Sequence, residues 1–103
     1  MAQIQPGDLL PNEHLERLVA DGTVTQLHRG HQYAEEGDTF EVGGEMFEVL
    51  DVEARRLGDL TDEDARAEGS ADLDAYRERL DAVHDEFEWD DDSEVVRHRF
   101  APR

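Results

Sequence analysis

The residues of this sequence best suited to binding a charged ligand lie around Arg29. His28 precedes it and His31 follows it, at the end of a segment, 23–29, that alternates as a β-strand does. An arginine binds phosphate through two parallel hydrogen bonds, and its flat guanidinium stacks on nucleobases. Tyr33, in the loop that follows, supplies an aromatic ring, although such a ring is more often a packing residue. The group therefore predicts a site for RNA or a nucleotide-like ligand at the end of this strand.

A second basic group, formed by Arg97, His98 and Arg99, lies near the end of the chain, and Arg55 and Arg56 are candidates to join it. These side chains form a positive face if they are exposed together. They are structural if each neutralises an Asp or Glu on a neighbouring strand, where a cross-strand pair contributes about 0.2–1 kcal/mol. We favour the second interpretation, because acidic residues are so abundant in this chain.

A metal site is not indicated. His28 and His31 are three residues apart, but they are expected in a strand and a loop, so no helix face brings them together. The acidic segment 90–92 lacks the glycine and terminal glutamate of a calcium-binding loop. The chain has no cysteine. We expect no metal and no cofactor.

The charge of the chain is extreme. It has 28 acidic and 10 basic residues, all of the latter arginine, for a formal net charge of −18. Such a charge repels itself, and salt screens the repulsion over about 10 Å at 0.1 M but about 3 Å at 1 M. Because the acids are interleaved with periodic apolar residues, we interpret the chain as a folded, halophilic-type acidic protein. Disorder and mimicry of nucleic acid are the alternatives.

Length and hydropathy set further bounds. A chain of 103 residues suits one domain, 1–103, with one modest core. Its start has no basic region followed by an apolar run, and no stretch approaches the roughly 20 apolar residues of a membrane span. We therefore expect a cytoplasmic protein with no membrane partner. The oligomeric state stays open.

Hydrophobic spacing predicts both helices and strands. The expected helices are about 13–21, capped by Asn12, then 61–69, capped by Thr61, and a third that Ser70 caps and that reaches Phe87. The expected strands are 23–29, 39–42, 45–53 and 95–100, the middle two joined at Gly43-Gly44. Without a regular alternation of strands and helices, the pattern indicates an α+β fold. A small barrel or strongly curved sheet with two to three flanking helices fits it best.

Three segments of this pattern resemble the ASCH family, whose domains are PUA-like β-barrels. They are Gly22 with the Thr-rich strand ending in Arg29, then Gly37-Asp38 followed by Phe40-Glu41-Val42 and the hairpin, and the helical stretch 60–69. The resemblance covers about residues 8 to 101, and the stretch 60–69 is its most specific part. It implies a PUA-like barrel and RNA binding, and we see no DNA-specific motif.

Some ASCH proteins look like small amidohydrolases that remove the acetyl group from N4-acetylcytidine. That activity is associated with a Lys and a Thr on the first strand and a Glu in the helical segment. When Arg29 is aligned with the family's strand-end arginine, these positions fall on Val24, Leu27 and Glu68. A slip in register places Thr25 at the Thr position, but the chain has no lysine at all. The resemblance thus leaves enzymatic activity uncertain and favours a non-enzyme.

Three hypotheses follow. The favoured one is an RNA- or nucleotide-binding module with a ligand cleft between the barrel and the 61–69 helix, lined by Arg29, Glu68, Thr25, His28 and Tyr33. It predicts a continuous groove lined by arginine. The second is a diverged amidohydrolase, in which Thr25 and Glu68 are catalytic and lie within hydrogen-bond reach in a closed pocket. The third is an acidic protein-interaction adaptor, which predicts an exposed apolar patch.

Overall fold

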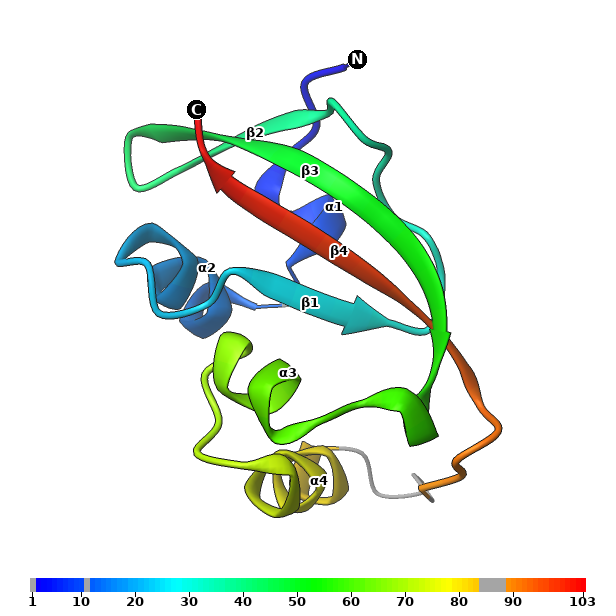
Figure 1. Cartoon of the computed structure of the whole chain (residues 1–103). Coiled ribbons are helices and arrows are strands. Elements are labelled where there is room, and N and C mark those ends of the chain that lie inside the picture. The colour runs from blue at the N-terminus through cyan, green and yellow to red at the C-terminus, as the bar shows by residue number, and fades with distance from the viewer. Residues whose placement is uncertain (1, 11, 84–88) are drawn as a thin grey trace.

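The chain forms a single curled antiparallel sheet in the computed structural model, which describes residues 2–10, 12–83 and 89–103. The strands are β1 (Gln26–Arg29), β2 (Thr39–Val42), β3 (Glu45–Arg56) and β4 (Glu94–Pro102). Their order in the sheet is β1-β4-β3-β2, and the long β3 bends so strongly that the sheet becomes a half-barrel (Figure 1). The predicted α+β fold with a small barrel-like sheet is confirmed.

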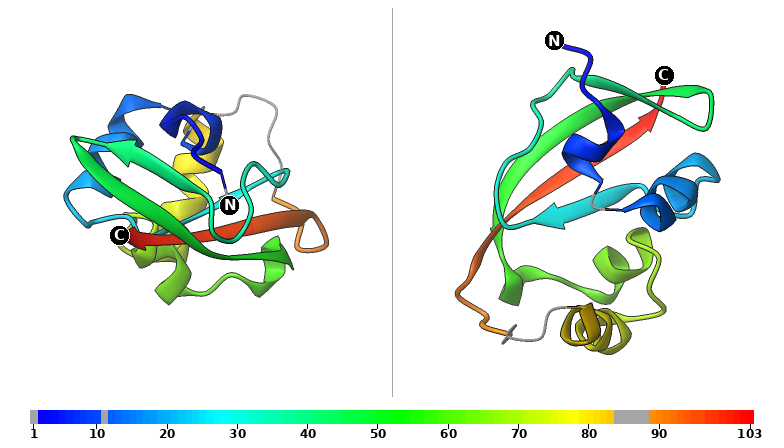
Figure 2. Two further views of the ribbon diagram at one scale, coloured as in Figure 1. Left: turned by 90° about the horizontal axis from the view of Figure 1, so that it is seen from above. Right: turned by 180° about the vertical axis from the view of Figure 1, so that it is seen from behind.

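Short helices flank the sheet. They are α1 (Pro6–Leu9), α2 (Glu13–Ala20), α3 (Asp62–Ala67) and α4 (Leu73–Val83), and a 3₁₀ turn lies at Leu57–Asp59. The helices α3 and α4 lie together beyond β1, whereas α1 lies on the concave side of the sheet (Figures 1 and 2). In the described parts of the chain, no helix combines the length and apolar character needed to span a membrane.

Strand pairing follows the predicted hairpin. Gly43 and Gly44 have φ of 61° and 81°, the left-handed conformation that a two-residue hairpin turn requires at both positions. The register of β3 against β4 shifts by one residue between Val49 and Asp51, so that Leu50 bulges outward and is exposed. A bulge increases local bending, and this one lies along the curved part of β3.

The half-barrel is filled by an aromatic core. The rings of Phe40 and Phe47 stack at 5.7 Å, and Phe100 meets Phe40 edge-on at 5.6 Å. Leu9 and Leu10, at the end of α1, are fully buried against this core. A second, smaller core lies beneath α3 and α4, where Leu60, Ala65 and Tyr76 are buried together. Two apolar clusters therefore lie on opposite sides of β1.

The predicted helix starts are confirmed twice and wrong once. The side chain of Asn12 accepts from the backbone N–H of Leu15 at 2.9 Å, and Thr61 forms a capping box with Asp64. The helix expected to start at Ser70 starts at Leu73 instead. Asp72 provides the capping oxygen, which accepts from the N–H of Ala75 at 2.8 Å. Asp caps a helix about as well as Ser does, so the cap has moved two residues along the chain. The part of the expected helix after residue 83 lies outside the described residues.

The first strand is shorter than predicted. The segment 23–25 alternates like a strand, but its amide groups bond to helices. The N–H groups of Thr23 and Val24 donate to the carbonyl of Leu18 in α2, and that of Thr25 donates to the carbonyl of Ala67 in α3. The ladder to β4 consequently begins at Gln26, and α3 is fixed against the start of β1.

We expect Phe40→Ala to destabilise the protein by about 3–5 kcal/mol, because it removes a fully buried ring that contacts two others. Chemical denaturation followed by circular dichroism measures the change. Leu50→Ala is the matched control, since Leu50 is 46% exposed, and it should change stability by less than about 0.5 kcal/mol. Equal effects of the two variants would contradict the assignment of this core.

Candidate functional site

The predicted site residues separate into two places on opposite faces of β1. Antiparallel pairing puts Leu27 beside His98 on the concave face, and His28 beside Arg97 on the outer face. Arg29 shares the concave face with Leu27, while Gln26 shares the outer face with His28. The residues that the sequence grouped into one cleft therefore lie on both faces of the strand.

On the outer face, a buried carboxylate joins β1 to both helices. Glu68 follows α3 directly and is 0% exposed. Its Oε1 accepts from the backbone N–H of His28 at 3.0 Å and from the hydroxyl of Tyr76 at 3.1 Å. Its Oε2 lies 2.7 Å from Nδ1 of His28 and accepts from the amide of Gln26 at 3.4 Å. We call Gln26, His28, Asp64, Glu68 and Tyr76 the Glu68 network.

The edge of this network is also paired. Asp64 accepts from the side chain of Gln26 at 3.1 Å and from the guanidinium of Arg55 at 3.2 Å. Burial acts to raise the pKa of Asp64, but the hydrogen bonds from Gln26 and Thr61, with the charge of Arg55, lower it overall. Asp64 is thereby held as the anion, and it links α3 to both β1 and β3.

The environment of Glu68 also acts on Tyr76. Burial, followed by the nearby charge of Glu68, raises the pKa of the Tyr76 hydroxyl far above its ordinary value. The hydroxyl therefore keeps its proton and serves as a donor to the carboxylate. Nε2 of His28 is buried and has no hydrogen-bond partner among the described residues.

The seam between β1 and α3 is packed, and the ligand cleft expected there is not evident. Gln26, His28, Ala65, Glu68 and Tyr76 are all buried in it. The side chain of Glu68 is bonded to Gln26, His28 and Tyr76, and no hydrogen bond found among the described residues joins it to Thr25. Thr25 is exposed. The pairing of Thr25 with Glu68 that an amidohydrolase requires is therefore not met.

On the concave side, Arg29 and Tyr33 lie together. The guanidinium of Arg29 lies 4.2 Å from the centre of the Tyr33 ring, and its Nη1 donates to the carbonyl of Leu9 at 2.6 Å. The ring of His31 meets that of Tyr33 edge-on at 6.3 Å. Tyr33 is 39% exposed, and a hollow of about 400 Å³ extends beside it along residues 32–38. We call Arg29, His31 and Tyr33 the Arg29 surface.

The arginines of the last strand do not extend this surface into a groove. Arg97 pairs with Glu53 at 2.6 Å, and Nε of Arg99 donates to Asp51 at 2.7 Å. The hydrogen bond that Arg99 donates to Asp51 raises the pKa of Arg99. These pairs connect β4 to β3 on the outer face, as the neutralising interpretation predicted, and the continuous arginine-lined groove is absent from the described part of the sheet.

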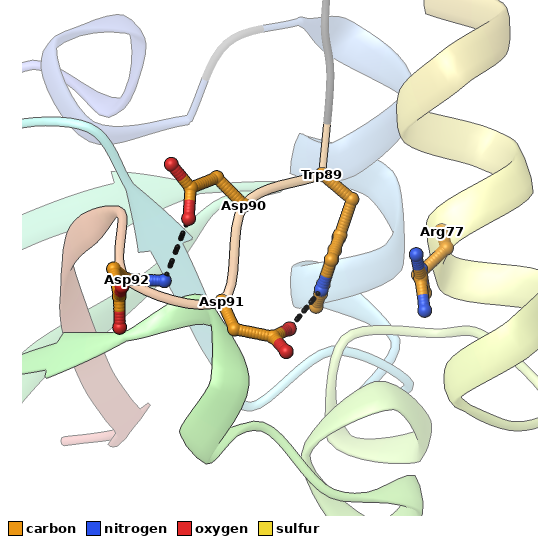
Figure 3. A pocket seen from close by; sticks show the side chains of 5 residues that line it. All are labelled: Arg77, Trp89, Asp90, Asp91 and Asp92. Carbon is orange, nitrogen blue, oxygen red and sulfur yellow. Dashed lines mark hydrogen bonds between the residues drawn. The ribbon is translucent and has the colours of Figure 1, made fainter.

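A second hollow, of about 590 Å³, lies beside the acidic loop (Figure 3). Trp89 faces into it, but the guanidinium of Arg77 lies 4.6 Å from the centre of the Trp89 ring. The indole N–H donates to Asp91 at 2.7 Å. Trp89 is therefore engaged within the chain. The described residues contain no group of acids and histidines arranged to hold a metal ion.

Sequence reasoning missed Gln26 and Tyr76 as partners of Glu68. The sequence did contain a signal for Gln26. Gln26 and His28 are polar residues on either side of Leu27, in a strand otherwise rich in apolar and β-branched residues. Tyr76 was recognised only as part of an apolar stripe. Its role depends on the angle between α3 and α4, which cannot be predicted from the spacing of residues in the sequence.

Comparison with known proteins was made by sequence and by structure. No family model and no curated protein matches the chain. Among solved structures, an ASCH domain from Lactobacillus crispatus JV V101 superposes with a TM-score of 0.66 at 15% identity, over 98% of this chain and 78% of that one. The chain has an ASCH-like fold. A protein of Enterococcus faecalis V583 assigned to the family DUF984 superposes with a TM-score of 0.60 at 18% identity, over the same shares.

The ASCH-like fold accounts for the three segments that suggested the family. Gly22 ends α2 with φ of 85°, Gly37 turns the loop before β2 with φ of 91°, and Gly69 ends α3 with φ of 88°. Each lies where a helix or loop gives way to the next element of the half-barrel.

We expect Glu68→Ala to destabilise the protein by about 3 kcal/mol or more, because it leaves donors of His28 and Tyr76 buried without a partner. Thermal and chemical denaturation measure the loss. Glu63→Ala, on the exposed side of α3, is the control and should cost less than about 0.5 kcal/mol. A fully stable Glu68→Ala protein would show that this network is not structural.

Proposed function

We propose that this protein is an RNA- or nucleotide-binding module that holds an unpaired base on the Arg29 surface. The observation that carries the proposal is the stacking of the Arg29 guanidinium on Tyr33, a ring that remains 39% exposed. The ASCH-like fold supports an RNA-binding-type module as the class.

Stacking suits this chain better than phosphate attraction does. A net charge of −18 repels a polyanion, and counterion release contributes little in concentrated salt. Stacking of a base on an aromatic side chain contributes about 1–3 kcal/mol and does not depend on net charge. The hydrogen bond from Arg29 to the carbonyl of Leu9 fixes the guanidinium in the free protein. Less side-chain entropy is therefore lost when a base binds.

The competing functions are supported less. The amidohydrolase needs Thr25 beside Glu68, but Thr25 is exposed and the carboxylate is bonded elsewhere. The adaptor needs an apolar patch, but the large exposed hydrophobic side chains of the described residues are Tyr33 and Leu50, on different elements. We place the ligand on the Arg29 surface and not in the β1–α3 seam.

We expect short single-stranded RNA to bind in molar KCl, and Tyr33→Ala or Arg29→Ala to weaken binding about tenfold or more. Fluorescence anisotropy with a panel of single-stranded RNA, tRNA and N4-acetylcytidine measures the affinities. Arg17→Ala, which removes an exposed arginine of α2, is the matched control and should bind like the wild type.

Two results would contradict the proposal. Unchanged affinity of both Arg29→Ala and Tyr33→Ala would place any ligand elsewhere. If no member of the panel binds, the protein is not an RNA- or nucleotide-binding module. Consumption of N4-acetylcytidine would instead revive the amidohydrolase.

We also propose that the protein is adapted to a salt-rich cytoplasm. If self-repulsion limits its stability, the unfolding midpoint should rise as KCl increases from about 0.1 M to about 2 M. Over this range the Debye length falls from about 10 Å to below about 3 Å, so the repulsion is screened. Urea denaturation at each salt concentration measures the effect, since urea leaves ionic strength unchanged. A midpoint that is constant over this range would contradict the adaptation.

A further inference from the structure

His98 lies directly beneath the Arg29 surface, in the middle of the sheet. Its neighbours across the ladder are Leu27 of β1 and Val52 of β3. The side chain is 0% exposed and points to the same concave face as Phe100, the aromatic residue two positions along β4. A histidine in such a place needs hydrogen-bond partners for both ring nitrogens, because water does not reach it.

Both ring nitrogens have partners. Nε2 accepts from the backbone N–H of Tyr33 at 3.1 Å, a bond that spans 65 residues of sequence. An amide N–H can only donate, so Nε2 must be the unprotonated nitrogen, and the proton lies on Nδ1. Nδ1 faces the carbonyl of Leu27 at 3.4 Å. His98 is thus neutral, in one tautomer, and holds the loop after β1 to the sheet.

A proton added to His98 would break this link. It would place an N–H on Nε2 directly opposite the N–H of Tyr33, so that two donors face each other. Burial is the main cause that lowers the pKa of His98. The hydrogen bond to the carbonyl of Leu27 opposes it, and Arg29 and His28 on β1 add to the lowering. Val52 on β3 is uncharged, while Arg97 and Arg99 on β4 point to the opposite face. The neutral state therefore persists at neutral pH, and protonation needs a more acidic solution than an ordinary histidine requires.

We propose that His98 is a positioning residue that sets Tyr33 against Arg29, so that acidification releases the loop and weakens ligand binding at the Arg29 surface. The part concerning the ligand rests on the proposed function. The link between His98 and Tyr33 does not, because it is a property of the free protein.

The sign of the effect is specific to the buried link. Charging His98 releases Tyr33 and lowers affinity for RNA, whereas a positive charge added at the ligand surface itself would raise affinity.

The experiment has two readouts on the same samples. Nuclear magnetic resonance follows the His98 ring, the Tyr33 amide and the methyl groups of the core as pH falls from about 7.5 until the His98 ring is protonated or the core unfolds. Anisotropy measures the affinity for single-stranded RNA over the same range. We expect the Tyr33 amide to lose protection with the midpoint of the His98 ring while the core stays folded, and affinity to fall about tenfold.

His98→Gln and His31→Gln are the variants. The glutamine oxygen can accept from the Tyr33 amide and does not titrate, so His98→Gln should bind RNA with little dependence on pH. His31→Gln should keep the acid-induced loss. If His98→Gln does not fold, the wild-type titration still decides, because it needs no substitution.

A Tyr33 amide that does not follow the His98 ring overturns the proposal, as does unfolding of the core in the same step. Affinity that rises on acidification overturns its ligand part. If RNA binds at no pH, the proposed function fails, while the resonance titration still tests the link between His98 and Tyr33.

Discussion

The carboxylate of Glu68 stands at the junction of three elements, and their arrangement depends on satisfying it. A buried charge is tolerated only when donors surround it. Those donors come from the backbone and ring of His28, from Gln26, and from Tyr76 on α4. The helices α3 and α4 are consequently held against the outer face of β1. The two apolar cores, one on each side of this strand, are joined through a polar layer that allows little choice of geometry.

Fixing β1 in this way has a consequence on its other face. The strand cannot turn without breaking the contacts of His28, so Arg29 is directed to the concave side, where it meets Leu9 and Tyr33. The two conspicuous groups of the first strand therefore have separate roles. The Glu68 network stabilises the fold, and the Arg29 surface presents an aromatic ring and a cation to solvent. His98, held at 0% exposure, connects this surface to the centre of the sheet.

The acidic composition shapes which residues remain available for binding. Asp51 and Glu53 engage the arginines of β4, and Asp64 engages Arg55. Such pairs contribute little individually where they are exposed, but they engage Arg55, Arg97 and Arg99 with acidic partners. For a chain with a net charge of −18, the proposed ligand is then one recognised through stacking and hydrogen bonds.

The sequence by itself determined the local elements and the class of fold. Asn12, Thr61 and the Gly43-Gly44 turn act through neighbours in the chain, so their caps and hairpin could be predicted. The proximity of Arg29 and Tyr33 was also predictable, because only three residues lie between them. The partners of Glu68 were not. Its contacts to His28 and Gln26 span about 40 residues, and they depend on the angle at which α3 meets β1. Only the tertiary structure decided that one carboxylate is structural and that His98 lies beneath Tyr33, because burial and long-range pairing are set by how the elements pack together.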